Sequence, residues 1–211
     1  MRALKLCLLM LYHPITVGEY IVRHRGDARF KAMGWITVGC ILAVMLGVNI
    51  FSIYYTHFPL STVSVRKANL LLECGKLFVP VLTRILASYL MTTILDGATT
   101  LSEAILYNCL ALTPYVLFTV PITLLSRILD LTQAGLYGFL TYAVIVWVVA
   151  LMLIGLKNMN DYTVGKTALI ILLTLFTMLG IWATVVLLFT IFSQFVTMIK
   201  EVYYEVIYRM R

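Results

Sequence analysis

Apolar residues dominate the chain in long runs that short polar stretches separate. The five longest runs cover approximately residues 35–55, 70–95, 105–128, 138–156 and 167–199. A helix needs about 20 apolar residues to cross the ~30 Å hydrocarbon core of a bilayer. The pattern therefore predicts an all-α, polytopic membrane protein with five transmembrane helices.

The last run, residues 167–199, contains no charged residue and no turn signal. As one helix it would extend about 50 Å, well beyond the thickness of a hydrocarbon core. We expect a single tilted helix that continues past the membrane, with Gly180 as the position where it could bend. Residues 200–211 carry charges on one side and Tyr and Val on the other, so they predict an interfacial C-terminal tail.

Composition supports the membrane class. Hydrophobic residues make up 62% of the chain, charged residues 12%, and the mean hydropathy is +1.00, which leaves too little charge to cover a soluble domain. The net charge of +7 could favour nucleic acid, but six of the sixteen basic residues lie in the first 34 positions. These six are Arg2, Lys5, Arg23, Arg25, Arg29 and Lys31.

That placement predicts a cytoplasmic N-terminus and contact with anionic lipid headgroups. The headgroup candidates are Arg23, Arg25, Arg29 and Lys31. The loop after the first crossing carries only Arg66 and Lys67. Five crossings would place Lys200, Arg209 and Arg211 outside, against the charge rule.

Residues 1–34 predict an amphipathic, basic segment at the membrane surface. A short helix over residues 1–13 should end at Pro14, whose ring and missing N–H prevent continuation. The predicted organisation is thus an interfacial segment (1–34), a five-helix domain (35–199) and the tail (200–211).

Three charged side chains lie inside the second predicted crossing. Glu73 and Lys76 are an i,i+3 pair, and Glu73 and Arg84 project about 20° apart on a helix. A charge in the hydrocarbon region is costly unless it faces protein, water or another charge. Glu73 and Lys76 could extend to the interface, whereas Arg84 lies deeper and is either an ion-pair partner or a packing charge. Pro80 predicts a kink between them.

Small residues recur every fourth position in the first crossing, at Gly39, Ala43 and Gly47. They share one helix face, and such faces allow close backbone approach between membrane helices. We interpret this face as a helix-packing surface.

The polar stretch 96–104 separates the second and third crossings. Gly97 is expected as the C′ residue of the second helix, and Ser102 or a preceding threonine as the cap of the third, with Glu103 in its first turn. Asp96 and Glu103 are read either as helix-end charges in a solvated turn, which is favoured, or as a carboxylate pair for a cation or basic partner.

The third crossing contains Pro114 and Pro121, which should kink it, while Thr113 and Thr119 could bond the freed carbonyls.

The sequence contains no residues arranged in a recognisable catalytic motif. Cys7, Cys40, Cys74 and Cys109 form no CxxC pair and are interpreted as core residues. His13, His24 and His57 lie in terminal or loop segments, away from any nucleophile motif. No metalloprotease, P-loop or dinucleotide motif occurs. We therefore predict a protein that is not an enzyme and needs no cofactor or metal.

The stretch "ILDGATTLSEAILYNCLALTPYVLF" between the second and third helices, in a five-helix chain, resembles the Yip1 family. The resemblance is carried by Gly97, Thr99, Thr100, Glu103, Ala111 and Pro114 and extends over approximately residues 14–200. It implies a non-enzymatic membrane protein. Eukaryotic members act in vesicle traffic through a long cytosolic region, but only about 34 residues precede the first crossing here.

The compact form is similar to bacterial members encoded beside carbohydrate ABC importers. The expected function is therefore an accessory or scaffolding subunit of a transport complex in a bacterial cytoplasmic membrane, in contact with other membrane proteins such as ABC permeases. Two alternatives are a small transporter or channel lined by the Arg84 face and a membrane-shaping or trafficking protein acting through its interfacial ends.

Overall fold

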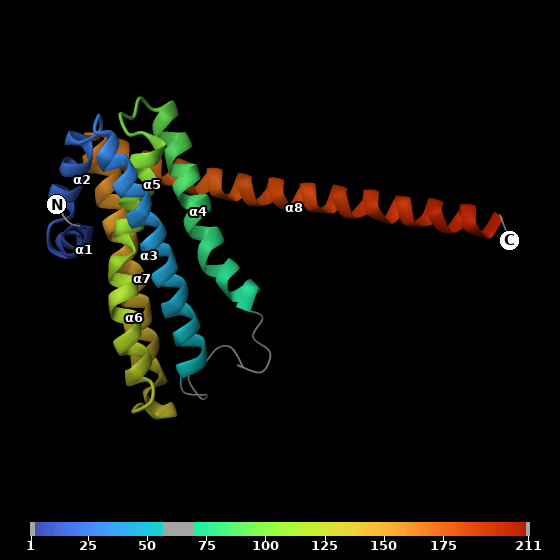
Figure 1. Ribbon diagram of the computed structural model, residues 1–211, viewed down its shortest axis with the longest axis horizontal. Coiled ribbons are helices and arrows are strands. Elements are labelled where there is room, and N and C mark those ends of the chain that lie inside the picture. Colours follow the sequence, from blue (N-terminus) through green and yellow to red (C-terminus); the bar gives the residue numbers. More distant parts are fainter. Residues whose placement is uncertain (1–2, 57–69, 210–211) are drawn as a thin grey trace.

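The computed structural model describes residues 3–56 and 70–209, and helices make up almost all of them (Figure 1). The helices are α1 (Ala3–Tyr12), α2 (Pro14–Arg23), α3 (Ala28–Tyr55), α4 (Leu70–Ile94), α5 (Leu101–Ala111), α6 (Thr113–Leu125), the 3₁₀ turn η3 (Leu131–Gln133), α7 (Ala134–Met159) and α8 (Val164–Arg209). No strand occurs within the described ranges. Arg2, His57, Arg66, Lys67 and Arg211, which the sequence analysis considered, lie outside them.

Five helical segments of the described chain are long and apolar enough to cross a membrane: α3, α4, α5 with α6, α7 and α8. This confirms the all-α class and the number of candidate spans. α3 begins at Ala28, seven residues before the predicted start of the first crossing. The start is explained by Asp27, whose Oδ1 accepts a hydrogen bond of 3.0 Å from the N–H of Arg29 and caps the helix.

The third crossing is divided in two at Leu112. Pro114 has no N–H, so the carbonyl of Leu110 loses its usual helical partner. The hydroxyl of Thr113 donates to that carbonyl at 2.6 Å, which confirms the role predicted for Thr113. Pro121 lies inside α6, and Pro80 lies inside the continuous helix α4.

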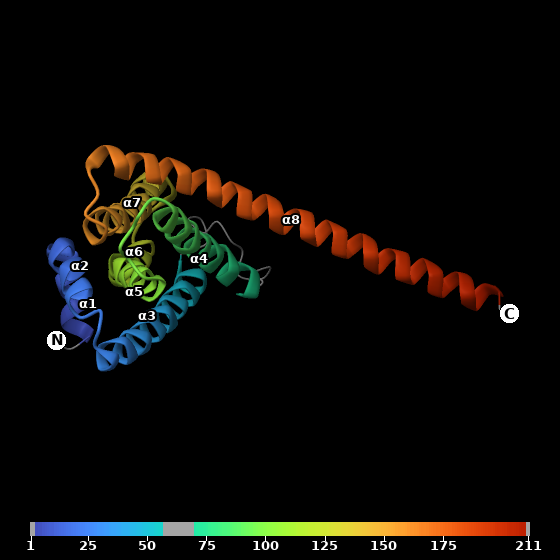
Figure 2. The same ribbon diagram turned by 90° about the horizontal axis from the view of Figure 1, so that it is seen from above.

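The core lies where α3, α5, α6 and α7 meet, with α1 and α2 packed on the outside of α5, α6 and α7 (Figures 1 and 2). Met10, Val17 and Ile21 of the N-terminal helices are fully buried in this core. Pro14 separates α1 from α2 as predicted and occupies the first turn of α2. One apolar face of α1 and α2 thus belongs to the bundle, while Leu4, Leu8, Tyr12 and Ile15 are exposed, and contact of the outer faces with headgroups stays a prediction.

Helix α8 is continuous over 46 residues and does not break at Gly180. Its first part packs on α4, where Thr167, Ile170 and Thr174 are buried. The remainder leaves the bundle and extends far from it, as both views show (Figures 1 and 2).

Candidate functional site

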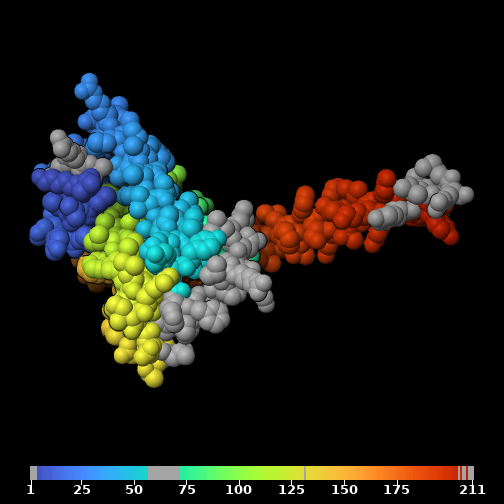
Figure 3. All heavy atoms as spheres, turned by 60° about the horizontal axis from the view of Figure 1, so that its bottom comes forward, coloured from blue at the N-terminus to red at the C-terminus, as the bar shows by residue number. Residues whose placement is uncertain are grey.

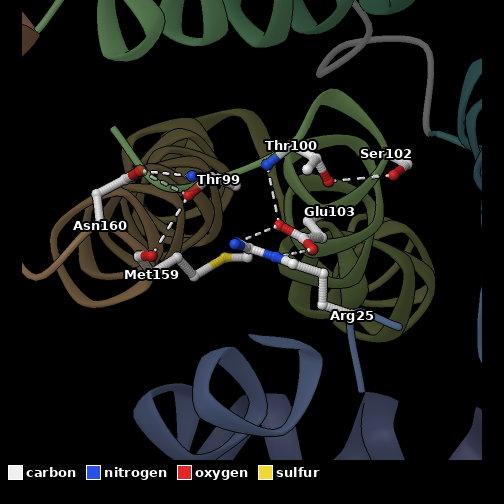
Figure 4. A network of polar contacts seen from close by, with 7 residues as sticks. All are labelled: Arg25, Thr99, Thr100, Ser102, Glu103, Met159 and Asn160. Atoms are coloured by element: carbon white, nitrogen blue, oxygen red, sulfur yellow. Dashed lines mark hydrogen bonds and ion pairs between the residues drawn. The ribbon is translucent and has the colours of Figure 1, made fainter. Parts of the chain in front are cut away.

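A cluster of polar side chains joins three separate parts of the chain at the end of the bundle where α4 and α7 finish. We call Arg25, Thr99, Thr100, Glu103, Asn160 and Tyr162 the polar junction. Figure 4 shows that Arg25 and Asn160 approach the segment 99–103 from opposite sides, from the linker after α2 and from the end of α7.

Arg25 and Glu103 form the charged half of the junction. The Nε and Nη2 groups of Arg25 donate to the two carboxylate oxygens of Glu103 at 2.7 and 2.8 Å. Glu103 also accepts a hydrogen bond of 2.9 Å from the backbone N–H of Thr100, the N-cap of α5. The hydrogen bonds to Glu103 raise the pKa of the Arg25 guanidinium above its usual range.

This geometry corrects two predictions. Glu103 does lie in the first turn of its helix, and Thr100, one of the predicted candidates, is the cap. However, the Glu103 side chain is only 7% exposed and ion-paired, so it is not a charge in a solvated turn. Arg25, expected at lipid headgroups, is instead committed to this carboxylate. The reason is tertiary: α2 and α5 pack together, and this brings the linker over the start of α5.

The uncharged half of the junction joins Thr99 to Asn160. The backbone N–H and the hydroxyl of Thr99 both donate to Oδ1 of Asn160, at 3.1 and 2.6 Å. The Nδ2 group of Asn160 donates to the carbonyl of Leu156 at 3.0 Å, which fixes the amide. The turn before α5 is therefore attached to the C-terminal end of α7.

Asp96, not Gly97, occupies the C′ position of α4. Asp96 has a φ of 58°, whereas none of the described glycines has a positive φ. The N–H of Gly97 donates to the carbonyl of Thr92 at 2.7 Å, the bond that closes a Schellman motif. The predicted role of Gly97 is therefore wrong. A Cβ there would lie 2.7 Å from the Thr92 carbonyl oxygen and 2.7 Å from the hydroxyl of Tyr162, so glycine is required for close approach.

Tyr162 completes the end of α4. Its hydroxyl lies 3.4 Å from the carbonyl of Thr92 and 3.3 Å from that of Leu95, and donates to them. α7 ends in the same way as α4, because Asp161 has a φ of 51° and the N–H of Tyr162 donates to the carbonyl of Lys157 at 3.0 Å. Asp96 is exposed and does not form a pair with the buried Glu103.

The charged residues inside α4 separate into two environments. Lys76 and Glu73 form the predicted i,i+3 ion pair, at 2.6 Å. Arg84 pairs with no carboxylate within the described residues. Its Nη1 group donates to Oδ1 of Asn108 on α5 at 2.9 Å, and Nδ2 of Asn108 donates to the carbonyl of Ala104 at 2.7 Å. Glu73 and Arg84 are therefore not partners despite sharing a helix face.

The predicted packing face of α3 points away from the bundle. Gly39, Ala43 and Gly47 are exposed, and a Cβ at either glycine would meet no atom within 4 Å. α3 instead packs through Val38, Ile41 and Met45, because larger side chains fill the core there. The small-residue face is thus open to lipid or to another chain. The remaining headgroup candidates, Arg23, Arg29 and Lys31, are exposed, as such a role requires.

Two residues that the sequence analysis missed hold the middle of the bundle. Tyr107 is almost completely buried, and its hydroxyl donates to the carbonyl of Leu151 at 3.2 Å. Its ring occupies the space that a Cβ at Gly155 would need. No local sequence pattern predicts the contact between Tyr107 and Gly155. Asn108 carried a signal, because an amide in an apolar run needs a polar partner.

The described residues contain no group of three His, Cys, Asp or Glu side chains placed to hold a metal ion. Cys109 is buried and Cys7 and Cys74 are half-buried, but Cys40 is exposed and is not a core residue. The site consists of hydrogen bonds and ion pairs between helices, and its geometry serves to hold the bundle together.

The chain matches no family model, no curated protein and no solved structure. The resemblance to the Yip1 family therefore stays a prediction. Of the residues that carry it, Thr99, Thr100, Gly97 and Glu103 belong to or adjoin the polar junction, and Ala111 and Pro114 flank the break between α5 and α6.

Proposed function

We propose that this protein is a non-catalytic subunit of a multi-pass membrane complex that docks on another integral membrane protein through the distal part of α8. We define distal α8 as residues 183–199, beyond Trp182, whose Nε1 group donates to the hydroxyl of Thr83 on α4 at 3.4 Å. The observation that supports the proposal is the exposure of this segment. From Ala183 to Ile199 every side chain is exposed except the half-buried Val196, and the segment projects from the bundle as a single helix (Figure 3).

Distal α8 is apolar on all sides. The consecutive residues Leu187, Leu188 and Phe189, which point in three directions around the helix, are 57%, 59% and 73% exposed. A helix that is apolar all round is stable only inside a membrane or against other protein. No charged residue occurs between Lys166 and Lys200. Distal α8 therefore lacks the polar face that a helix lying at the headgroups needs.

One face of α8 favours a protein partner over lipid alone. The part of α8 that lies against the bundle contacts α4, and its buried residues Thr167, Ile170 and Thr174 are spaced by three and four residues. The same spacing continues along distal α8 through residues 184, 188, 191, 195 and 198. Residues repeated at this spacing form the seam of a helix–helix contact. The face that binds α4 is thus extended into a segment where this chain supplies no second helix among its described residues.

The exposed small-residue face of α3 adds a second surface suited to helix contact. If the Yip1 resemblance holds, the partner is a permease subunit of a carbohydrate ABC importer in a bacterial cytoplasmic membrane, with the N-terminus inside.

Site-specific photocrosslinking in native membranes tests the proposal. A photoreactive residue at Leu188 lies on the continued seam, and the same residue at Val186 lies on nearly the opposite face of the helix. We expect Leu188 to crosslink to one membrane protein, identified by mass spectrometry, and Val186 to crosslink to lipid. Crosslinks to lipid from both positions, or only between copies of this chain, would contradict docking on another protein. Recovery of a lone monomer in mild detergent would also weigh against it.

A stand-alone transporter is the second candidate, and Arg84 is the observation that favours it. The backbone of Arg84 lies about 15 Å along the helix axis from the end of α4 at Ile94, within the apolar span. This function predicts solute flux in proteoliposomes that contain only this chain and loss of that flux in Arg84→Ala.

A further inference from the structure

A small cavity with both polar and apolar walls lies between α4, α5 and α7, separate from distal α8. Its polar lining comes from Arg84, Ser88, Thr92, Thr99, Asn108 and Asn160, with Tyr89 and Tyr107 beside them. The first three are spaced by four residues along α4 and face the same side. Thr99 and Asn160 belong to the polar junction, so the cavity extends from the middle of α4 toward the end of the bundle.

The cavity has one full positive charge and no negative one. Its described lining includes no Asp, Glu, Lys or second Arg. Of the acidic side chains nearest in sequence, Glu73 pairs with Lys76 and Glu103 pairs with Arg25, whereas Asp96 is exposed after the end of α4 and does not line the cavity. Arg84 therefore has no counter-charge from the described chain.

Asn108 does not substitute for a counter-charge. A guanidinium carries five N–H donors and stays protonated at physiological pH. The contact with Asn108 uses Nη1 and a neutral carbonyl oxygen, so most of the donors of Arg84 remain for another group. An ionised side chain inside a membrane span is costly unless a charge or water compensates it.

The other polar groups of the cavity suit a ligand that the guanidinium binds. The hydroxyls of Ser88 and Thr92 donate to helix carbonyls at 3.0 and 2.9 Å. They can rotate toward a bound ion without breaking a helix, because those carbonyls also take part in the helical ladder. Nδ2 of Asn108 has a second N–H beyond the one that bonds Ala104. The guanidinium of Arg84, the second N–H of Asn108 and these hydroxyls are donors that an anion can use.

The space open to a water-sized molecule is about 30 Å³. A single water needs about 10–15 Å³ by this measure, whereas pockets for sugars or nucleotides enclose several hundred. The ligand is therefore limited to one or two waters or a compact ion.

We propose that Arg84 binds a small monovalent inorganic anion, such as a halide, in this cavity, with Asn108 and Ser88 as further contacts. The anion supplies the missing charge and enters from the end of the bundle, past Thr92, Thr99 and Asn160. The proposal does not depend on docking through α8.

Chloride NMR tests it with the full chain in an uncharged detergent. Sodium chloride is added to protein held in sodium gluconate at constant ionic strength, and the broadening of the ³⁵Cl line is measured. We expect saturable broadening in the wild type and about 10- to 100-fold weaker binding in Arg84→Gln. Arg127→Gln is the matched control, because Arg127 is exposed and bonds the carbonyl of Tyr55 at 3.3 Å, far from the cavity. It should bind chloride like the wild type.

A second variant tests the proposal independently in case Arg84→Gln does not fold. Ser88→Leu keeps the guanidinium but fills the cavity, and it should also lose saturable binding. Its helix content and its migration in size-exclusion chromatography show whether it folds. Absence of saturable broadening in the wild type would mean that water alone fills the cavity and would overturn the proposal. Binding that persists in folded Arg84→Gln or Ser88→Leu would place the anion elsewhere and overturn it as well.

Discussion

The guanidinium of Arg25 and the carboxylate of Glu103 are joined by two hydrogen bonds, although 78 residues separate them in the chain. The contact attaches the linker between α2 and α3 to the first turn of α5. Because Glu103 is almost fully buried, removal of Arg25 leaves a carboxylate with little access to water. The free-energy cost of leaving this buried carboxylate unpaired exceeds the stabilisation that the ion pair itself provides.

Arg25→Gln should lower the free energy of unfolding by about 1–2 kcal/mol, a value reduced for the solvent screening of a guanidinium that is 38% exposed. Titration with SDS in mixed micelles measures this. Arg23→Gln, at an exposed position on the same helix end, should change stability by less than about 0.5 kcal/mol. Equal effects of the two substitutions would show that the ion pair contributes nothing specific.

Gly155→Ala should destabilise the bundle by about 2 kcal/mol or more, because the new methyl group would overlap the buried ring of Tyr107. Gly138→Ala on the same helix is the control, since a Cβ there meets no atom within 4 Å. Thermal unfolding in detergent, followed by circular dichroism, measures both. The combination of Gly155→Ala with Tyr107→Leu should recover part of the loss, and strict additivity of the two changes would argue against the contact.

Asp96→Gly should stabilise the protein by about 0.5–1 kcal/mol, because glycine adopts the φ of 58° without steric cost. Gly97→Ala should destabilise it by more than about 1 kcal/mol, since a Cβ would press on the Thr92 carbonyl oxygen. Because the two positions are adjacent, opposite changes in stability would distinguish the positive φ at residue 96 from the close approach at residue 97. A stabilising Gly97→Ala would contradict the close approach at Gly97, and a destabilising Asp96→Gly would contradict the assignment of Asp96 as the C′ residue.

Stability should fall in alkaline solution through Tyr162. Burial, and then the nearby charge of Asp96, raise the pKa of Tyr162 above its usual value of 10.0. The folded chain therefore keeps the phenol proton to higher pH than the unfolded chain does. Below the unfolded pKa the contribution of Tyr162 is fully present, and it is lost as pH rises through the folded pKa.

Unfolding midpoints measured from pH 8 to about 12 check this expectation. Tyr162→Phe should flatten the decline above pH ~10, whereas Tyr142→Phe, at a side chain that is 71% exposed, should not. Parallel curves for Tyr162→Phe and the wild type would contradict the assignment.

Several features could be predicted from the sequence because they depend only on residues close together in the chain. The breaks at Pro14 and before Pro114 follow from a missing N–H, and the Glu73–Lys76 pair follows from the geometry of one helix turn. Local rules could not predict which face of a helix packs inside the bundle, because that depends on the other helices. The small residues Gly39, Ala43 and Gly47 could have packed inside the bundle, but the structure turns them outward.

Only part of the candidate site could be predicted from the sequence. Glu103 was expected at a helix start, yet nothing in the local pattern pointed to Arg25 as its partner or to Asn160 as the partner of Thr99. Arg84 was recognisable as a deep charge, but its contact with Asn108 depended on how α4 and α5 align.

The amino-acid sequence alone determined the helical class, the five apolar segments and the exceptional length of the last one, because the bilayer and the peptide backbone set these through residue type and spacing. Only the tertiary structure decided that α1 and α2 join the core, that Arg25 reaches Glu103, and that Arg84 has no counter-charge from the described chain. Those outcomes depend on contacts between residues far apart in the chain, and such contacts form only when whole helices find their packing partners.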